Sequence, residues 1–292
     1  MSKKFIGTGV ALVTPFDDRN KVDFKALENI VEYVIQGNVD YLVVLGTTGE
    51  SVTVDEKERA DILKTVYHIK QDKPIVLGIG GNDTHKITQQ LERTDASYYD
   101  AILSVCPYYN KPSQKGLINH FTLIAEKSLK PIILYNVPGR TSVNLTAQST
   151  IELAKHPNIV GIKEASGDFS QCISILKNTN EDFLLISGDD LLALPLIAVG
   201  AKGLISVIAN GLPIQMSSII RNSLNNKFKE ASEILLQISH LIELMFKEGN
   251  PTGIKAMLEI LNLCNKAVRP PLMTASEELV KEISRAYKHA GI

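Results

Sequence analysis

The residue with the clearest capacity for chemistry lies in one short apolar run. Positions 159–166 read Ile-Val-Gly-Ile-Lys-Glu-Ala-Ser, a pattern typical of a strand buried on both faces. An ammonium group buried without a partner is costly, so such an amine tends to lose its proton and becomes a nucleophile that forms Schiff bases with carbonyl compounds. Lys163 is therefore a candidate for imine chemistry. The alternative is that it sits at a strand end, reaches solvent and pairs with a nearby carboxylate.

Two other segments place hydroxyl groups and a cation at expected strand ends. Residues 46–51 read Gly-Thr-Thr-Gly-Glu-Ser, and their hydroxyls and amides can hold a carboxylate, although an ordinary turn with a helix cap would look the same. If Tyr135 alternates inward on its strand, its hydroxyl points into the same barrel mouth as Lys163. Arg140 follows just beyond and can clamp a carboxylate with its planar guanidinium.

The remaining polar positions are weaker candidates. Tyr108 and Tyr109 lie in a loop bounded by prolines, where simple packing is the favoured interpretation. Asp190 is interpreted as a helix cap rather than a catalytic group. The small residues among 203–206 are interpreted as only leaving space at the end of the strand. The six histidines lie at positions 68, 85, 120, 156, 240 and 289, and none of these positions falls on an expected strand. This argues against a metal-dependent barrel hydrolase, and we expect no metal site.

Composition narrows the class of protein. The 292 residues carry a net charge of -1 with 22% charged residues, so we expect neither a nucleic-acid nor a membrane partner. Three widely spaced cysteines form neither a disulfide framework nor a metal-binding spacing, which suits a reducing compartment. The first five residues are not followed by an apolar signal region, and no run approaches a membrane span. We therefore expect a cytoplasmic protein.

The elements that must position these residues alternate regularly. Eight apolar strand patterns are separated by segments of helical periodicity, at positions 9–16, 41–45, 75–79, 101–106, 132–137, 159–165, 183–187 and 204–209. This alternation predicts an α/β protein built on a closed (β/α)₈ TIM barrel. A doubly wound open sheet is the alternative, but the turn Thr14-Pro15-Phe16-Asp17 cannot serve as a glycine-rich dinucleotide turn.

The pattern changes after the eighth strand. Helical periodicity alone continues at 219–224, 231–246, 252–263 and 276–290, interrupted by Gly249-Asn250-Pro251 and Arg269-Pro270-Pro271. We therefore predict a catalytic barrel over residues 1–224 and a C-terminal helical bundle over residues 225–292.

Taken together, the 46–51 loop, Tyr135-Asn136-Val137-Pro138 and Gly161-Ile162-Lys163-Glu164 resemble the pyruvate-dependent class I aldolase family, which includes N-acetylneuraminate lyases and dihydrodipicolinate synthases. The resemblance covers the whole chain. Arg140 and the pair Thr47-Thr48 are similar to the dihydrodipicolinate synthase branch, because the neuraminate lyases carry no arginine there and have Ser-Thr in the loop.

This resemblance implies condensation of pyruvate with L-aspartate 4-semialdehyde, on the diaminopimelate route of lysine biosynthesis. It implies that Lys163 forms the imine, that Thr47 and Thr48 hold the pyruvate carboxylate, and that Arg140 orients the second substrate. Tyr135, Thr48 and Tyr109 would form a hydroxyl proton relay. We also place Gly188 and Ile205 among the substrate-binding residues. The covalent imine makes a cofactor unnecessary, so we expect none.

In the family a neighbouring subunit contributes the tyrosine that matches Tyr109, so a homodimer or homotetramer is implied. Two other functions stay open: a related lyase or aldolase acting on sialic acid or a 2-keto-3-deoxy sugar acid, and a non-catalytic ligand-binding barrel. Arg140 argues against the first, and the set of Lys163, Tyr135 and Thr48 argues against the second.

The resemblance also bears on regulation. In feedback-inhibited relatives a glutamate lies four positions after an asparagine and binds L-lysine. Here the asparagine is Asn82, and the residue four positions after it is Lys86. Two histidines of that pattern are replaced by Glu56 and Arg59, while Ser51, Asn82 and Tyr108 match. Like charges about 4 Å apart repel by roughly 1 kcal/mol in water. We therefore expect weak inhibition by L-lysine.

Overall fold

Residues 2–292 are described by a computed structural model, in which eight parallel strands close into a barrel in chain order. The strands are β1 Gly7–Ala11, β2 Tyr41–Val44, β3 Ile75–Gly78, β4 Ala101–Val105, β5 Ile132–Asn136, β6 Ile159–Glu164, β7 Leu184–Ser187 and β8 Gly203–Ser206. The barrel closes through pairing of β1 with β8. The expected (β/α)₈ barrel is confirmed. A closed barrel suits these strands because a buried strand satisfies its backbone N–H and C=O groups by pairing with a neighbour on each side.

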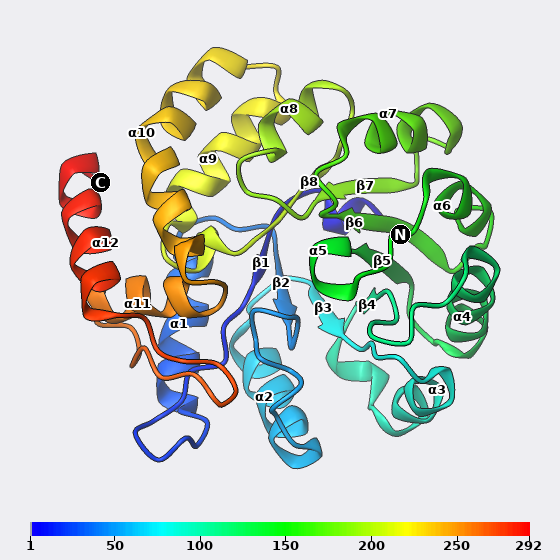
Figure 1. Ribbon diagram of the computed structural model, residues 1–292, viewed down its shortest axis with the longest axis horizontal. Coiled ribbons are helices and arrows are strands. Elements are labelled where there is room, and N and C mark those ends of the chain that lie inside the picture. The colour runs from blue at the N-terminus through cyan, green and yellow to red at the C-terminus, as the bar shows by residue number, and fades with distance from the viewer. Residues whose placement is uncertain (1) are drawn as a thin grey trace.

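Most of the helices surround this barrel as an outer layer (Figure 1). The helices are α1 Phe24–Gln36, α2 Glu56–Ile69, α3 Thr84–Arg93, α4 Gln114–Lys127, α5 Pro138–Thr141, α6 Ala147–Leu153, α7 Phe169–Asn178, α8 Ala193–Ala198, α9 Pro213–Leu224, α10 Phe228–Lys247, α11 Thr252–Ile260 and α12 Glu277–Ala290. Within residues 2–292, none of them is long and apolar enough to cross a membrane.

Alternation along the strands divides the core into two parts. Residues pointing outward pack beneath the helices, as Val10 and Leu42 do. Residues pointing inward fill the barrel, among them Ile133, Tyr135 and Val137 on the β5 side. Because successive side chains of a strand face opposite ways, this alternation decides which polar groups enter the barrel mouth.

The first strand is shorter than expected. The apolar run 9–16 predicts a strand to Phe16, but β1 ends at Ala11. Beyond it, the Val13 amide donates to Asn210 Oδ1 at 3.1 Å, and the Thr14 hydroxyl donates to the Gly49 carbonyl at 2.7 Å. Pro15 has no amide to offer a ladder, so the chain leaves the barrel wall and joins the loops at its mouth.

The C-terminal helices form the predicted appended part, beyond the last barrel helix α9. Figure 1 shows α10, α11 and α12 together on one side of the barrel, with α11 beside α1. Helix α11 ends at Ile260 rather than at 263. The proposed division between residues 224 and 225 falls between the end of α9 and the start of α10.

Candidate active site

Lys163 lies on β6 and faces the barrel interior. The register between β5 and β6 shifts near Val160, and beyond this irregularity Ile162 belongs to the outer layer of the core. Lys163 therefore points inward, and only 5% of the residue is exposed to solvent. Among residues 2–292 it forms no ion pair with a carboxylate, unlike the other buried lysine, Lys255, which pairs with Glu50. The alternative of a solvated, paired Lys163 is not what the structure shows.

Tyr135 stands directly beside this amine. The two residues are register partners on adjacent strands, and Lys163 Nζ lies 4.5 Å from the centroid of the Tyr135 ring. Ile133, Tyr135 and Val137 share the barrel interior, so the inward alternation expected for Tyr135 is observed. The arrangement brings an amine and a phenol together at one place in the barrel.

The next residue on β6 has a different environment. Glu164 faces outward and is buried, where its carboxylate accepts hydrogen bonds from the Gln171 side-chain amide at 2.9 Å and the Ser166 backbone amide at 2.7 Å. Asn136 Nδ2 also donates to both of its oxygens, at 3.1 and 3.0 Å. These bonds satisfy the carboxylate away from Lys163 and hold the end of β6 against β5.

The small residue predicted at the end of β7 makes room for the lysine. A side chain at Gly188 would place a carbon 3.0 Å from Lys163 Cε and 2.6 Å from Ala165 Cβ. Glycine is thus required beside the lysine stem. Ile205 on β8 is fully buried and faces the barrel interior. The structure places both residues inside or at the rim of the barrel, and their contact with substrate stays a prediction.

The loop after β2 brings two threonines to the same mouth. Leu45 and Glu50 have φ values of 59° and 50°, and these two left-handed positions fold the loop into a tight turn before α2. Thr47 is half-buried and lines the cavity described below. Thr48 is buried, and its hydroxyl oxygen accepts a hydrogen bond of 3.0 Å from Asn250 Nδ2.

Arg140 also lines the cavity at this mouth. It sits in the short helix α5, which begins at Pro138 directly after β5. Its guanidinium donates to the Asn250 backbone carbonyl at 3.1 Å. Asn250 therefore contacts both Thr48 and Arg140, although the sequence drew attention to residues 249–251 only as a break between helices. The Asn-Pro pair inside a helical region was the one available signal for it.

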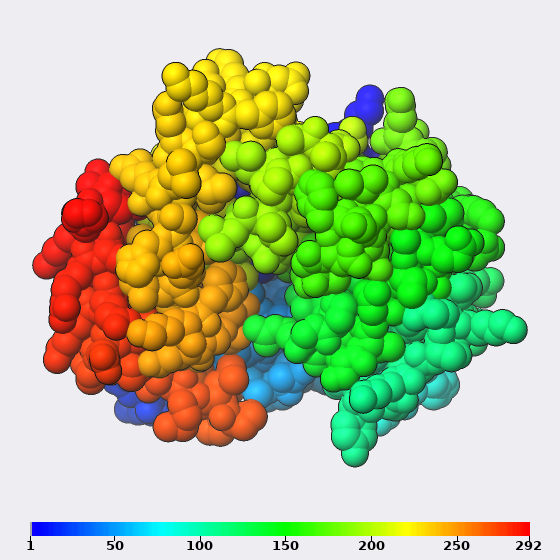
Figure 2. All heavy atoms as spheres, turned by 45° about the horizontal axis from the view of Figure 1, so that its top comes forward, coloured from blue at the N-terminus to red at the C-terminus, as the bar shows by residue number. Residues whose placement is uncertain are grey.

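A cavity of about 450 Å³ lies at the barrel mouth, and Lys163, Thr48, Gly188, Ile205 and Asn250 are not among the residues that line it. Its lining includes Gly46, Thr47, Val105, Tyr135 and Arg140. Figure 2 shows this side of the molecule hollowed between residues drawn in orange, near position 250, and the green segments, with blue atoms at the floor. The space suits small carboxylates, because a hydroxyl, loop amides and a guanidinium converge on it.

The two tyrosines after β4 take different places. Tyr108 is half-buried and lines the cavity, and its carbonyl accepts from Asn82 Nδ2 at 3.1 Å. Tyr109 is 89% exposed, with a φ of 74°. Packing within the chain, the favoured interpretation for this pair, is therefore wrong for Tyr109. Its ring projects from the molecule, and the structure does not bring it to Thr48 and Tyr135 of its own chain.

The interpretation of Asp190 as a helix cap is also wrong. The neighbouring Asp189 caps the following turn, accepting from the amides of Leu191 and Leu192 at 2.9 and 3.1 Å. Asp190 is instead buried and accepts a hydrogen bond from the Ser206 hydroxyl on β8. Burial raises the pKa of Asp190 to about 6 against the opposing effect of this bond. It joins the ends of β7 and β8 beneath the mouth.

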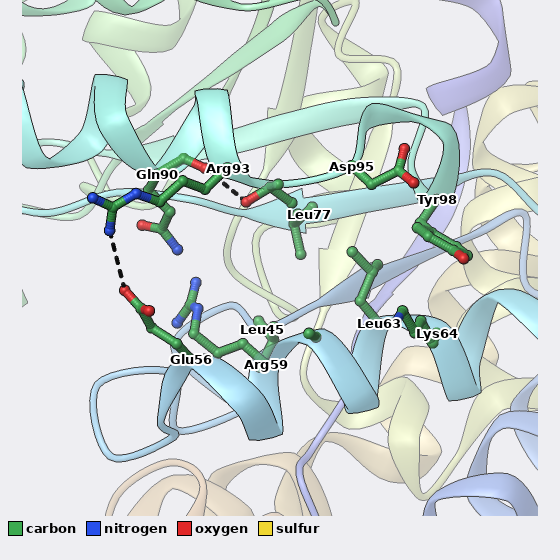
Figure 3. A pocket seen from close by; sticks show the side chains of 12 residues that line it. Leu45, Glu56, Arg59, Leu63, Lys64, Leu77, Gln90, Arg93, Asp95 and Tyr98 are labelled. Atoms are coloured by element: carbon green, nitrogen blue, oxygen red, sulfur yellow. Dashed lines mark hydrogen bonds and ion pairs between the residues drawn. The ribbon is translucent and has the colours of Figure 1, made fainter.

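A second cavity, of about 360 Å³, lies outside the barrel between α2 and α3 (Figure 3). Arg59 from α2 points toward Gln90 on α3, and Glu56 pairs loosely with Arg93 at 3.9 Å. Arg59 is held by the carbonyls of Ser51 and Gly78, each at 3.0 Å, and burial lowers its pKa. Of the residues considered for regulation by L-lysine, Glu56 and Arg59 line this space, whose charged lining also includes Lys64, Arg93 and Asp95.

Comparison with known proteins gives consistent relatives. Residues 4–290 match the model of the dihydrodipicolinate synthetase family. The chain is 47% identical to 4-hydroxy-tetrahydrodipicolinate synthase from Cytophaga hutchinsonii, covering 97% of this chain and 96% of that protein. It is also 47% identical to the protein of that name from Flavobacterium psychrophilum, with 94% of each chain covered.

Solved structures agree with the sequence relatives. Dihydrodipicolinate synthase from Thermotoga maritima superposes with a TM-score of 0.95 at 35% identity, covering 98% of both chains. The chloride-inhibited dihydrodipicolinate synthase from Acinetobacter baumannii, complexed with pyruvate, gives a TM-score of 0.95 at 37% identity and covers 98% of this chain and 99% of that one. The likeness therefore extends over the barrel and the C-terminal helices alike.

Proposed function

Because the chain belongs to the dihydrodipicolinate synthetase family, we propose that it condenses pyruvate with L-aspartate 4-semialdehyde to give 4-hydroxy-tetrahydrodipicolinate. The observation that carries the proposal is Lys163, a buried amine that forms no ion pair among residues 2–292 and lies beside Tyr135 at the barrel mouth. A ligand-binding barrel has no use for such a group. The reaction is that of a Schiff-base-forming lyase on the diaminopimelate route to lysine.

The reaction begins with pyruvate alone. The Lys163 amine attacks the ketone carbon, and loss of water gives a protonated imine. The imine nitrogen withdraws electrons, so a methyl proton of pyruvate leaves and an enamine forms. The enamine carbon attacks the aldehyde of the second substrate. The amine of that substrate then displaces Lys163 by transimination as the ring closes, which returns the free amine.

Three hydroxyls are proposed to move the protons in these steps. Tyr135 is next to the amine, Thr48 is buried in the loop after β2, and Tyr109 comes from a neighbouring subunit. Positioned acid-base groups of this type accelerate each proton transfer. The amides and hydroxyls of Thr47 and Thr48 hold the pyruvate carboxylate, with Gly188 and Ile205 shaping the space around the imine.

No cofactor is part of the proposal, because the imine itself serves as the electron sink that carbanion chemistry needs. A cytoplasmic location is likewise proposed. It is supported by three free cysteines, two of them buried, which suit a reducing compartment.

We propose a homodimer as the smallest active unit, and a homotetramer is compatible with it. The support is Tyr109, whose ring is 89% exposed in the single chain although the relay requires it in an enclosed site. Sedimentation velocity at assay concentration is the measurement that decides this. A fully active monomer would contradict the proposed origin of Tyr109.

A coupled assay tests the function directly. The protein is supplied with pyruvate and L-aspartate 4-semialdehyde in one arm and with N-acetylneuraminate in the other, and consumption of each is followed. We expect turnover in the first arm only, because Arg140 is present where the neuraminate lyases lack it. Cleavage of N-acetylneuraminate at a comparable rate would assign the chain to the alternative lyase activity.

Arg140 should affect the aldehyde substrate more than pyruvate. A paired carboxylate contact of this kind is worth about 1.5–3 kcal/mol, so Arg140→Ala is expected to raise the KM for L-aspartate 4-semialdehyde by roughly 10- to 100-fold. Trapping of pyruvate by borohydride should persist. A fall in trapping as large as the rise in KM would show that Arg140 acts on the first substrate.

Inhibition by L-lysine should be weak. The ligand is a cation, and the side chain of Lys86, where the sensitive relatives carry a glutamate, is itself a cation and is 82% exposed. A steady-state titration is expected to leave most activity at about 1 mM L-lysine, since each repulsive contact costs roughly 1 kcal/mol. Lys86→Glu is the matched variant and should increase sensitivity. Strong inhibition of the unmodified protein below this concentration would contradict the charge argument.

A further inference from the structure

The pairing of β6 with β5 contains an irregularity shortly before Lys163. The register on β6 passes from Ile159 directly to Gly161 and skips Val160. Successive side chains of a strand face opposite ways, so one skipped residue exchanges the inward and outward positions that follow it. Ile159 packs in the outer part of the core. An uninterrupted strand would therefore turn Lys163 outward as well, and the irregularity is what turns it into the barrel.

Beyond this point a side-chain bond holds the two strands in register. Asn136 and Glu164 are register partners, one position after the pair of Tyr135 with Lys163. Asn136 Nδ2 donates to the two carboxylate oxygens of Glu164 at 3.1 and 3.0 Å. Both residues are buried, so the bond forms in a medium of low dielectric constant, where it is stronger than in water. A slip of one position would separate the two groups and turn Lys163 away from Tyr135.

Backbone partners fix the orientation of the amides that meet this carboxylate. The Leu145 backbone N–H can only donate, and it reaches Asn136 Oδ1 at 2.9 Å. The nitrogen of the Asn136 amide must then be the atom that faces Glu164, whose carboxylate accepts. Gln171 is oriented in the same way, because its Nε2 donates to the Leu145 carbonyl at 3.3 Å and to Glu164 Oε2 at 2.9 Å. The direction of each bond therefore follows from its partners.

Glu164 also holds the strand end on the other side of Lys163. Its backbone carbonyl accepts from the Gly188 amide at 2.8 Å, and a side chain at Gly188 would come within 3.0 Å of Lys163 Cε. Its Oε1 accepts from the Ser166 amide at 2.7 Å, which closes the bend that follows β6. The residue after Lys163 thus contacts both neighbours of the amine, the strand of Tyr135 and the end of β7.

We propose that Glu164 and Asn136 are positioning residues for imine formation: the bond between them fixes the register in which Lys163 faces Tyr135. A buried polar pair adds little net stability compared with apolar residues, and its best-attested use is to select one register. The inference rests on the proposed function and extends it to the outer side of the barrel wall. Both side chains point away from the barrel mouth, so they act through Lys163 and Tyr135 and not on the substrate.

The rate of imine formation with pyruvate tests the proposal, measured by borohydride quenching at successive times and by peptide mapping of the label. In Glu164→Gln one carboxylate oxygen becomes an NH₂ group, which faces the Asn136 nitrogen whichever way the new amide turns. We expect the maximal rate to fall by roughly tenfold or more, because misplaced reacting groups react slowly. The label should remain on Lys163. An unchanged maximal rate would overturn the inference.

The dependence on pyruvate concentration separates positioning from general disruption. The concentration that gives half of the maximal rate should change less than about twofold in Glu164→Gln, because the loop that carries Thr47 is not altered. A rise in this concentration as large as the fall in rate would show that the whole pyruvate site had been disturbed, and would contradict a role confined to the lysine.

Gln114→Leu is the matched control. It removes a hydrogen-bonded amide from the same side of the barrel, where Gln114 donates to the Asn144 carbonyl and accepts from the Ser149 hydroxyl, each at 2.7 Å. Its rate of imine formation should match that of the unmodified protein, and equal slowing would assign the effect to loosening of this side of the barrel. If the unmodified protein traps no pyruvate, the proposed function fails. If it does and Glu164→Gln traps pyruvate equally fast, only the inference fails.

Asn136→Ala covers the case in which Glu164→Gln folds poorly, because Glu164 keeps its bonds from Gln171 and Ser166. It should slow imine formation to a similar extent. Where both single variants fold, the double variant tests whether the two residues act as one unit. A pair that acts through a single bond is lost only once, so the double variant should form the imine about as slowly as either single variant. Slowing equal to the product of the two single effects would contradict the proposed bond.

Discussion

Replacing Lys163 with arginine is expected to abolish imine formation. Borohydride reduction in the presence of pyruvate should label Lys163 in the unmodified protein, as peptide mass mapping would show, and leave no label in Lys163→Arg. A guanidinium stays protonated and is not a useful nucleophile. We expect turnover to fall by roughly 10⁴-fold or more, equivalent to about 5 kcal/mol of transition-state stabilisation.

The control for this experiment is Lys86→Arg. It makes the same chemical change at an exposed lysine outside the barrel mouth, and both labelling and turnover should persist. Label on a different lysine in the unmodified protein would show that the imine forms elsewhere. The position of Tyr135 beside Lys163, and the lack of an ion pair to Lys163 among residues 2–292, would then need another explanation.

Replacing Lys255 with methionine is expected to give the largest loss of stability. Lys255 and Glu50 form an ion pair between fully buried side chains, and the ammonium lies 4.2 Å from the centroid of the Phe16 ring. Burial lowers the pKa of Lys255, and Glu50 opposes this. Removing one partner of a buried pair leaves the other charge uncompensated, which typically costs about 3–5 kcal/mol. Urea denaturation should show this decrease in the free energy of unfolding.

The double variant Lys255→Met with Glu50→Gln provides the comparison. It removes both charges, so much of the stability should return, because the cost lies in the unpaired carboxylate. A loss as large as in the single variant would show that packing around the lysine stem dominates. The single variant should also lower turnover, since Glu50 holds the loop that carries Thr48.

Local patterns account for the fold and for part of the site. Burial periodicity is a property of neighbouring residues, so the alternation of strands and helices and the inward place of Tyr135 can be read from a few positions at a time. The apolar run around Lys163 likewise predicts a buried amine. The error in β1 has the same origin. Residues 12–16 are buried and mostly apolar, yet after Leu12, whose amide still donates to the Val43 carbonyl of β2, the hydrogen bonds go to Asn210 and Gly49.

Contacts between residues far apart in the sequence decided how the C-terminal helices meet the loops of the barrel mouth. Asn250 lies 202 positions from Thr48 and 110 from Arg140, and Lys255 lies 205 positions from Glu50. No periodicity connects such pairs, because each depends on how the C-terminal helices pack on the closed barrel. The sequence by itself determined the barrel, the buried amine of Lys163 and the polar residues expected at the same barrel mouth. Only the tertiary structure decided that Asn250, from outside the barrel, contacts Thr48 and Arg140, since hydrogen bonds are satisfied in space and not along the chain.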